Sequence, residues 1–404
     1  MRQLPIIESE PITNPPSTDY ERGKWYKRRG YLDKALESFK EAAKSDPTDN
    51  TRSGWKEIDL SWLEYGLLSM RMRAFHKSEE AFKTVLHHAG TYAQEALNHW
   101  AALLLLQGTT DEVIYEQLLA ETNRFPASHA MVGRSLYYIG AYPFASLCFA
   151  NQENLNPDTC IPYVSCLIMT DQLPEAIELI DSYLHGSKNS QGEQACPRAA
   201  ERNHLARIRQ LCEWKWEGRA PDRFIIMSEL LELARTAISL GMVSVAEELL
   251  ADCSDHTDYA LICFLYYEGY RGLAVSKINQ LEALPLQEHG SYSMNVCFIA
   301  AESLYDQGKY DEAASLLEQL RRSYPEHTET RFGEAACYLQ SALISLSSRL
   351  EEQYPPEPAR KEIEQYMDSI HAALHVVEST NWHTTWSPAQ RRIEGNSLTM
   401  SFLN

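Results

Sequence analysis

Histidine pairs are the first residues of this sequence that could bind a metal. His371 and His375 stand four residues apart in a predicted helix, so both side chains would lie on one face, as in a two-histidine metal edge. No Asp, Glu or Cys stands in a motif that would complete the set, and zinc needs at least three protein ligands. His87 and His88 are adjacent and would diverge on a helix, as surface residues do. We therefore expect no metal site and no cofactor.

Sequence motifs of catalysis are absent. The chain contains no phosphate-binding GxxxxGK[ST] or GxGxxG loop, no HExxH, no GxSxG nucleophile motif and no Asp-x-Asp pair. Its nine cysteines form no CxxC pair, and several lie in apolar helical stretches, which is typical of reduced thiols in a cytosolic protein. We therefore predict that the protein is not an enzyme and that it is located in the cytoplasm.

Charge and length exclude further classes of function. The net charge of −19 argues against a nucleic-acid or anionic-membrane binder, because both need an excess of Lys and Arg. No apolar stretch is long enough for a transmembrane helix or a signal peptide, so we expect no membrane insertion. With 404 residues, the chain exceeds the usual size of one compact globule. A repeat architecture avoids that limit because each repeat packs only on its neighbours.

A helical hairpin recurs along the sequence. In residues 129–157, two amphipathic segments flank Gly140, small residues stand where the helices approach closely, and Pro157 ends the unit. The equivalent small position of the second helix recurs about every 32 residues from its second copy on. Its predicted occupants in the first five copies are Ala35, Ala81, Val113, Ala145 and Ala176.

This spacing resembles the tetratricopeptide repeat family. Ser69 replaces the usual Gly or Ala in the second copy, and Val113 stands where Ala is usual in the third. The resemblance implies an all-α, right-handed superhelical solenoid of about eight helical hairpins with a C-terminal capping helix. It also implies a concave groove, lined by the first helix of each hairpin, that binds a peptide or a protein helix. The copies span residues 19–47, 58–90, 93–126, 129–157, 158–185, 222–253, 256–285 and 294–325.

Breaks in the pattern suggest a division of the chain. The predicted parts are a flexible N-terminal segment 1–18, an N-terminal repeat block 19–185, a loop and extra helix 186–221, a C-terminal repeat block 222–353, a capping helix 354–379 and a tail 380–404.

Transferring the groove positions of the family to this sequence gives a set rich in Tyr and Arg, which supply recognition area at low entropic cost. The alternative is that these first-helix tyrosines pack only on their neighbours. The predicted groove residues are Tyr20, Lys24, Lys27, Arg28, Asn98, Arg134, Tyr137, Tyr138, Arg235, Tyr259, Tyr266, Tyr267, Asn295, Phe298 and Tyr305.

Three functions fit these observations. The first is an interaction scaffold that binds a protein or peptide ligand in the groove. The second is a peptide-responsive regulator, similar to bacterial quorum-sensing repeat receptors. The third is an accessory subunit, because the tail Asn381–Arg392 is similar to the C-terminal end of bacterial proteins that join a family-2 glycosyltransferase to these repeats. The alternative for the tail is that Trp382 and Trp386 dock it onto the last repeat.

Overall fold

The computed structural model describes residues 16–44, 52–125, 128–152, 157–185, 199–218, 227–251, 256–286, 291–325, 327–353 and 355–378, together with Thr380 and Trp382. The predicted segment 1–18, the loop 186–198 and the tail beyond Trp382, with Trp386, lie largely or wholly outside these residues. Within the described ranges the regular secondary structure is α-helical and no strand occurs, as the all-α prediction requires.

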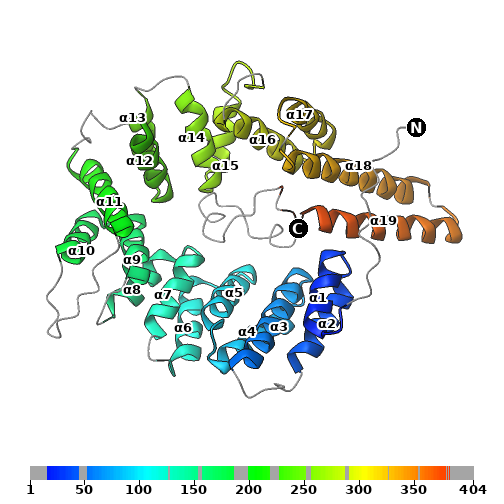
Figure 1. Cartoon of the computed structure of the whole chain (residues 1–404), viewed down its shortest axis with the longest axis horizontal. Helices are drawn as coiled ribbons and strands as arrows, with labels where there is room; N and C mark the ends of the chain where they lie inside the picture. Colours follow the sequence, from blue (N-terminus) through cyan, green and yellow to red (C-terminus); the bar gives the residue numbers. More distant parts are fainter. Residues whose placement is uncertain are drawn as a thin grey trace.

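The helices follow one another in antiparallel pairs (Figure 1). The first half contains α1 (Asp19–Arg28), α2 (Leu32–Lys44), α3 (Arg52–Arg71), α4 (Phe75–His88), α5 (Ala93–Leu106), α6 (Asp111–Thr122), α7 (Ser128–Tyr138), α8 (Tyr142–Ala150), α9 (Pro157–Met169) and α10 (Leu173–His185). The second half contains α11 (Ala199–Glu217), α12 (Met227–Ser239), α13 (Val243–Leu250), α14 (His256–Tyr267), α15 (Arg271–Ile278), α16 (Ser291–Asp306), α17 (Tyr310–Ser323), α18 (Glu329–Gln353) and α19 (Glu357–Glu378).

Eight hairpins, from α1–α2 through α9–α10 and from α12–α13 through α16–α17, confirm the predicted number of repeats. The single helix α11 joins the two groups: it packs on α10 and α9 before it and on α12 and α13 after it. The long pair α18–α19 ends the array. The handedness of the superhelix and the predicted domain boundaries stay predictions.

Glycines in three first helices admit an aromatic ring from the second helix of the same hairpin. A Cβ atom built on Gly133 would lie 2.8 Å from Cε1 of Phe149, closer than real Cβ contacts allow. A Cβ on Gly23 or Gly66 would lie 2.6 Å from the ring of Phe39 or Phe82. Because each of these rings is at most 1% exposed, the missing Cβ lets the two helices approach around a buried phenylalanine.

These pairs correct the predicted alignment of two repeats. In the second repeat the small residue is Gly66 and not Ser69, and its partner on α4 is Ser78, whose Oγ donates a 2.8 Å hydrogen bond to the Gly66 carbonyl. In the third repeat Val113 is 39% exposed, whereas the next residue, Ile114, is fully buried in the hairpin. Both errors arose because larger residues occupy positions where the pattern expects Ala.

The repeats curve until the two ends of the array meet (Figure 1). Helix α19 packs along α18, as the predicted cap does, and also reaches the first hairpin. There the turn residue Gly30 has a φ of +75°, and a Cβ on it would lie 2.6 Å from the carbonyl oxygen of Ala372. The array is therefore closed into a ring, which the sequence pattern did not predict.

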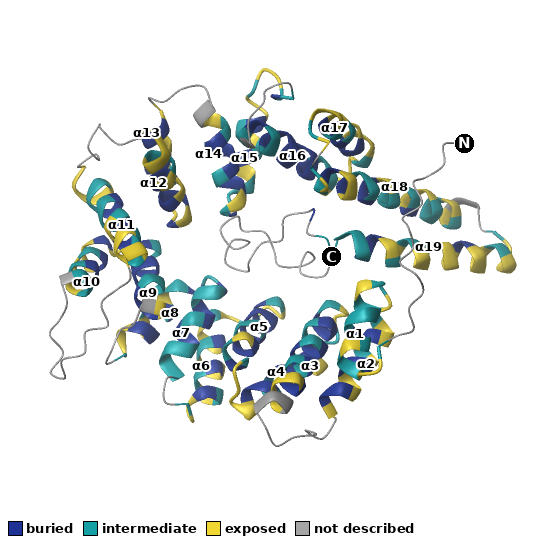
Figure 2. Ribbon diagram, in the orientation of Figure 1, coloured by how far each residue is buried: buried dark blue, intermediate teal, exposed yellow. Residues whose placement is uncertain are grey.

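Buried residues lie where successive helices face each other around this ring (Figure 2). One cluster lies under the first two hairpins, a second extends to α9, and a third runs from α9 to Trp382. Helix α9 contributes Cys166 to the second cluster and Cys160 to the third. All seven described cysteines are buried and free.

Candidate functional site

The first helices of the hairpins lie towards the inside of the ring, as Figure 1 shows for α5 relative to α6 and for α16 relative to α17. We call the surface that these first helices present the inner face. In its first half, side chains of neighbouring first helices contact each other in two places. Lys27 Nζ on α1 lies 2.7 Å from Glu64 Oε2 on α3, and the His99 ring on α5 lies edge-on to Tyr138 on α7 with 6.3 Å between centroids.

His99 is the largely buried member of these contacts. It stacks on the buried Phe82 ring at 5.8 Å, and its side chain is 20% exposed. Burial lowers the pKa of His99 to about 4, although the nearby Glu64 carboxylate acts in the opposite direction. The imidazole is therefore neutral at pH 7 and can contact an apolar or a hydrogen-bonding group of a ligand.

The second half of the inner face is built in the same way. Arg235 Nε on α12 lies 3.7 Å from Glu268 Oε1 at the end of α14, and Gln340 Nε2 on α18 donates a 3.3 Å hydrogen bond to the Tyr305 hydroxyl. Glu302 on α16 is completely buried. Burial, followed by this carboxylate, raises the pKa of Tyr266 well above its usual value.

Two predicted groove residues lie in the core instead of on the surface. Tyr266 is 1% exposed and Phe298 is 8% exposed, so neither offers area to a ligand. They face inward because α14 and α16 pack closely on each other, which covers side chains that an isolated hairpin would expose. Tyr267 is 39% exposed and lies on the surface beside them.

The predicted residues of α1 make mostly local contacts. Tyr20 packs on Phe39 with 5.9 Å between ring centroids, and Lys24 pairs with Glu21 at 3.1 Å within the helix. Lys27 belongs to the inner-face row, whereas Arg28 is exposed.

Helices α5 and α7 bring most predicted residues together. The Asn98 side-chain oxygen accepts hydrogen bonds from Gln94 Nε2 at 2.9 Å and from Ser135 Oγ at 2.7 Å, so it holds α5 to α7. Tyr137 is largely buried, and burial raises its pKa. Arg134 Nε is buried and makes no hydrogen bond within the described part of the chain.

The remaining predicted residues are half-buried or exposed. Arg235 is exposed beside Glu268, and Asn295 is half-buried on α16. Tyr259 is half-buried against the third cluster, and the Tyr305 ring lies against Trp382 with 4.9 Å between centroids.

The sequence did not reveal two residues of the inner face, His99 and Arg71, or the buried carboxylate of Glu302. His99 was overlooked because it does not stand at one of the groove positions that the resemblance to the family transfers. Arg71, at the end of α3, was missed because the second repeat was misaligned; its Nη2 lies 3.8 Å from Glu378 Oε2 on α19. Glu302 was missed because a carboxylate in an apolar helix carries no periodic signal.

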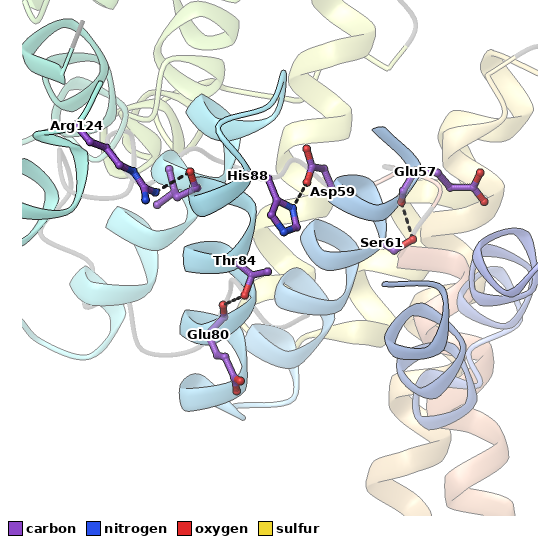
Figure 3. Close-up of polar contacts among 8 residues, drawn as sticks. Glu57, Asp59, Ser61, Glu80, Thr84, His88 and Arg124 are labelled. Atoms are coloured by element: carbon purple, nitrogen blue, oxygen red, sulfur yellow. Dashed lines mark hydrogen bonds and ion pairs between the residues drawn. The ribbon is translucent and has the colours of Figure 1, made fainter. Parts of the chain in front are cut away.

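Three of the four histidines in these pairs contact other side chains of the protein. His375 is buried, its Nε2 lies 3.2 Å from Arg71 Nη1, and His371 is exposed. His88 Nδ1 lies 2.7 Å from the buried Asp59 carboxylate (Figure 3), and His87 pairs with Glu121 at 3.0 Å. Adjacent histidines thus diverge, as expected, but each joins a different helix.

Among the described residues no group of three or more His, Cys, Asp and Glu side chains is arranged to hold a metal ion. In the same residues, no helix combines the length and the apolar character that crossing a membrane would require.

One comparison with known proteins agrees with the repeated hairpins. Residues 300–342, from α16 through α17 into α18, match a family model described as tetratricopeptide repeat. A crystal structure of the TPR domain of P58(IPK) aligns over 94% of this chain and 96% of that chain, with 18% sequence identity and a TM-score of 0.18. No curated protein matches. The family match indicates a tetratricopeptide repeat in the region of α16 to α18, and the hairpins that precede it repeat the same antiparallel pairing of helices.

Proposed function

We propose that this protein is a scaffold for protein–protein interaction that binds a peptide or a partner helix on the inner face, in the cytoplasm. Tetratricopeptide repeats are typically non-catalytic interaction modules, which supports a binding role. The observation that carries the finer proposal is the surface of α7. Arg134 and Tyr138 stand one helical turn apart on the same face, and the Arg134 Nε–H is buried without an acceptor among the described residues.

The chemistry of this surface favours a particular ligand. A guanidinium with an unused N–H is suited to a carboxylate or a backbone carbonyl. Tyr138 and, further along the ring, Tyr267 add aromatic surface that loses little conformational entropy on binding. An extended or helical segment with an acidic or carbonyl group facing Arg134 would satisfy both features.

Site-specific photocrosslinking in cells tests this proposal. A photoreactive phenylalanine analogue replaces Tyr138 or Tyr267 on the inner face, and Leu147, which is 54% exposed on the second helix α8, in the control. We expect the same partner to crosslink to both inner positions and not to position 147. Arg134→Ala should then weaken binding of the purified partner by roughly 1–2 kcal/mol. Crosslinks from position 147 alone, or unchanged affinity in Arg134→Ala, would show that the inner face is not the binding surface.

A peptide-responsive regulator is a second candidate, and the closure of the ring favours it. The two ends of the array meet through polar contacts of Arg71 with α19 and through the packing of Gly30 against Ala372. A ligand that binds better to one state of this contact would shift the ring between closed and open forms. Small-angle scattering with and without the partner peptide separates the two candidates, because a pure scaffold keeps its dimensions.

A further inference from the structure

The last helix pair, α18 and α19, lacks the aromatic residue that the second helix of a hairpin supplies in the repeats with Gly23, Gly66 and Gly133. Gly333 on α18 occupies the position of Gly133, where a hairpin admits a ring from its second helix. At the spacing that separates Gly133 from Phe149, however, the chain offers Arg349, an exposed residue still within α18. The continuous α18 therefore has no second helix at the place where the missing ring would stand.

Trp382, which follows the C-terminal end of α19 in the sequence, supplies the ring that packs on Gly333. A Cβ built on Gly333 would lie 2.7 Å from Trp382 Cε3 and 3.0 Å from Leu317 Cδ1. The indole stands edge-on to the Tyr305 ring, with 4.9 Å between centroids and an interplanar angle of 90°. Trp382 is 1% exposed, so the slot formed by Tyr305, Leu317 and Gly333 encloses it.

The last turn of α19, just before Trp382, also contacts the N-terminal part of the array. Arg71 on α3 contacts His375 Nε2 at 3.2 Å and Glu378 Oε2 at 3.8 Å. Burial and the nearby Arg71 and Lys27 cations lower the pKa of His375 to about 4, so a neutral imidazole faces the guanidinium.

A turn connects these contacts to the indole. Thr380 donates from both its backbone N–H (3.1 Å) and its Oγ1 (2.6 Å) to the carbonyl of Val377. Because Glu378 and Trp382 flank this turn, the position of the indole in the slot fixes the end of α19 against Arg71.

We propose that the slot of Tyr305, Leu317 and Gly333 is a binding site for a tryptophan side chain carried by a peptide segment, filled here in cis by Trp382, and that its occupation closes the ring. The ligand class is an indole because the slot is apolar, is bounded by an aromatic edge and gains its depth from the missing Cβ of Gly333. This proposal does not rest on the proposed function of the inner face.

Peptide binding to the full-length chain tests the site. The probe is a labelled synthetic peptide with the sequence of residues 377–385, VESTNWHTT, and its control has Ala in place of Trp. We expect the peptide to bind the Trp382→Ala variant at least about tenfold more tightly than the parent chain, whose slot is already occupied. The Trp216→Ala variant is the matched control, because Trp216 is 59% exposed, and it should behave like the parent.

Adding Gly333→Leu to Trp382→Ala should abolish binding, because a side chain at position 333 fills the slot. Equal binding to the parent and to Trp382→Ala, no binding to Trp382→Ala, or binding that survives Gly333→Leu would each overturn the site. If Trp382→Ala loses helical circular dichroism, Trp382→Leu retains an apolar side chain and serves for the same comparison.

Small-angle scattering tests ring closure in the same variants. Trp382→Ala and Arg71→Ala should each increase the radius of gyration relative to the parent, and saturating peptide should reverse the increase in Trp382→Ala alone. An unchanged radius in Trp382→Ala, with the peptide bound, would overturn the link between the slot and closure.

Discussion

Replacing Gly133 tests the close packing that defines each hairpin. A Cβ at this position would lie 2.8 Å from Cε1 of Phe149 and 3.1 Å from Cβ of Cys148, both in the core. Relieving such a contact requires the helices to move, which commonly costs about 1–3 kcal/mol. Replacing Gly by Ala within a helix recovers about 1 kcal/mol. We therefore expect Gly133→Ala to destabilise the hairpin by up to about 2 kcal/mol, and Gly133→Leu by more.

Amide hydrogen exchange of α7 and α8 is the appropriate assay, because repeat arrays do not unfold as one cooperative unit. The matched control is a double-mutant cycle with Phe149→Leu, which removes the ring that the new Cβ at position 133 would strike. Phe149→Leu alone should destabilise the hairpin by leaving a cavity, but together with Gly133→Ala the two changes should cost less than their sum. Additive effects, or a Gly133→Leu variant at least as stable as the parent, would refute the assigned packing.

Three further predictions concern stability. His99, with a pKa of about 4 against an ordinary 6.5, binds its proton less readily when folded, so its contribution is complete above about pH 6.5 and is lost as the pH falls towards 4. Urea unfolding at pH 7 and at pH 4 should show that His99→Gln reduces the pH-dependent loss of stability by roughly 3 kcal/mol, whereas a substitution of the exposed His371 should leave that loss unchanged. Gly90→Ala should cost about 1–3 kcal/mol, because the new Cβ would collide with the Asp59 carboxylate; a neutral outcome in urea unfolding would contradict this geometry. Arg124→Ala should cost about 0.5–1.5 kcal/mol, because the Leu86 carbonyl loses its 2.9 Å hydrogen bond from Arg124 (Figure 3) and keeps the one from the Ala89 N–H; hydrogen exchange at the end of α4 would measure the loss.

The sequence predicts the fold well because helical hairpins are local. Gly133, Gly140 and Ala145 specify one unit within a short stretch, and neighbouring units repeat the same contacts. The alignment failed where a polar or larger residue fills a small position. Ser78 can take the place of Ala on α4 because its hydroxyl bonds the Gly66 carbonyl in the same hairpin.

The site was predicted less completely because burial depends on neighbouring helices. Tyr266 and Tyr267 are adjacent in the sequence and identical in type. Tyr266 is nevertheless buried near Glu302, whereas Tyr267 lies on the surface. The contact between Arg71 and His375 joins residues far apart in the chain, and no periodic pattern relates them. Docking of the tail was predicted from Trp382 and Trp386, and the structure shows it for Trp382, which is 1% exposed.

Ring closure changes how this chain would come apart. In an open array the terminal units have one neighbour each and fray first. Here α19 lies against the turn at Gly30, so the first hairpin has a neighbour on both sides. Because α19 contacts the first hairpin and α3, removing the contact between Arg71 and Glu378 should restore two fraying ends to the array.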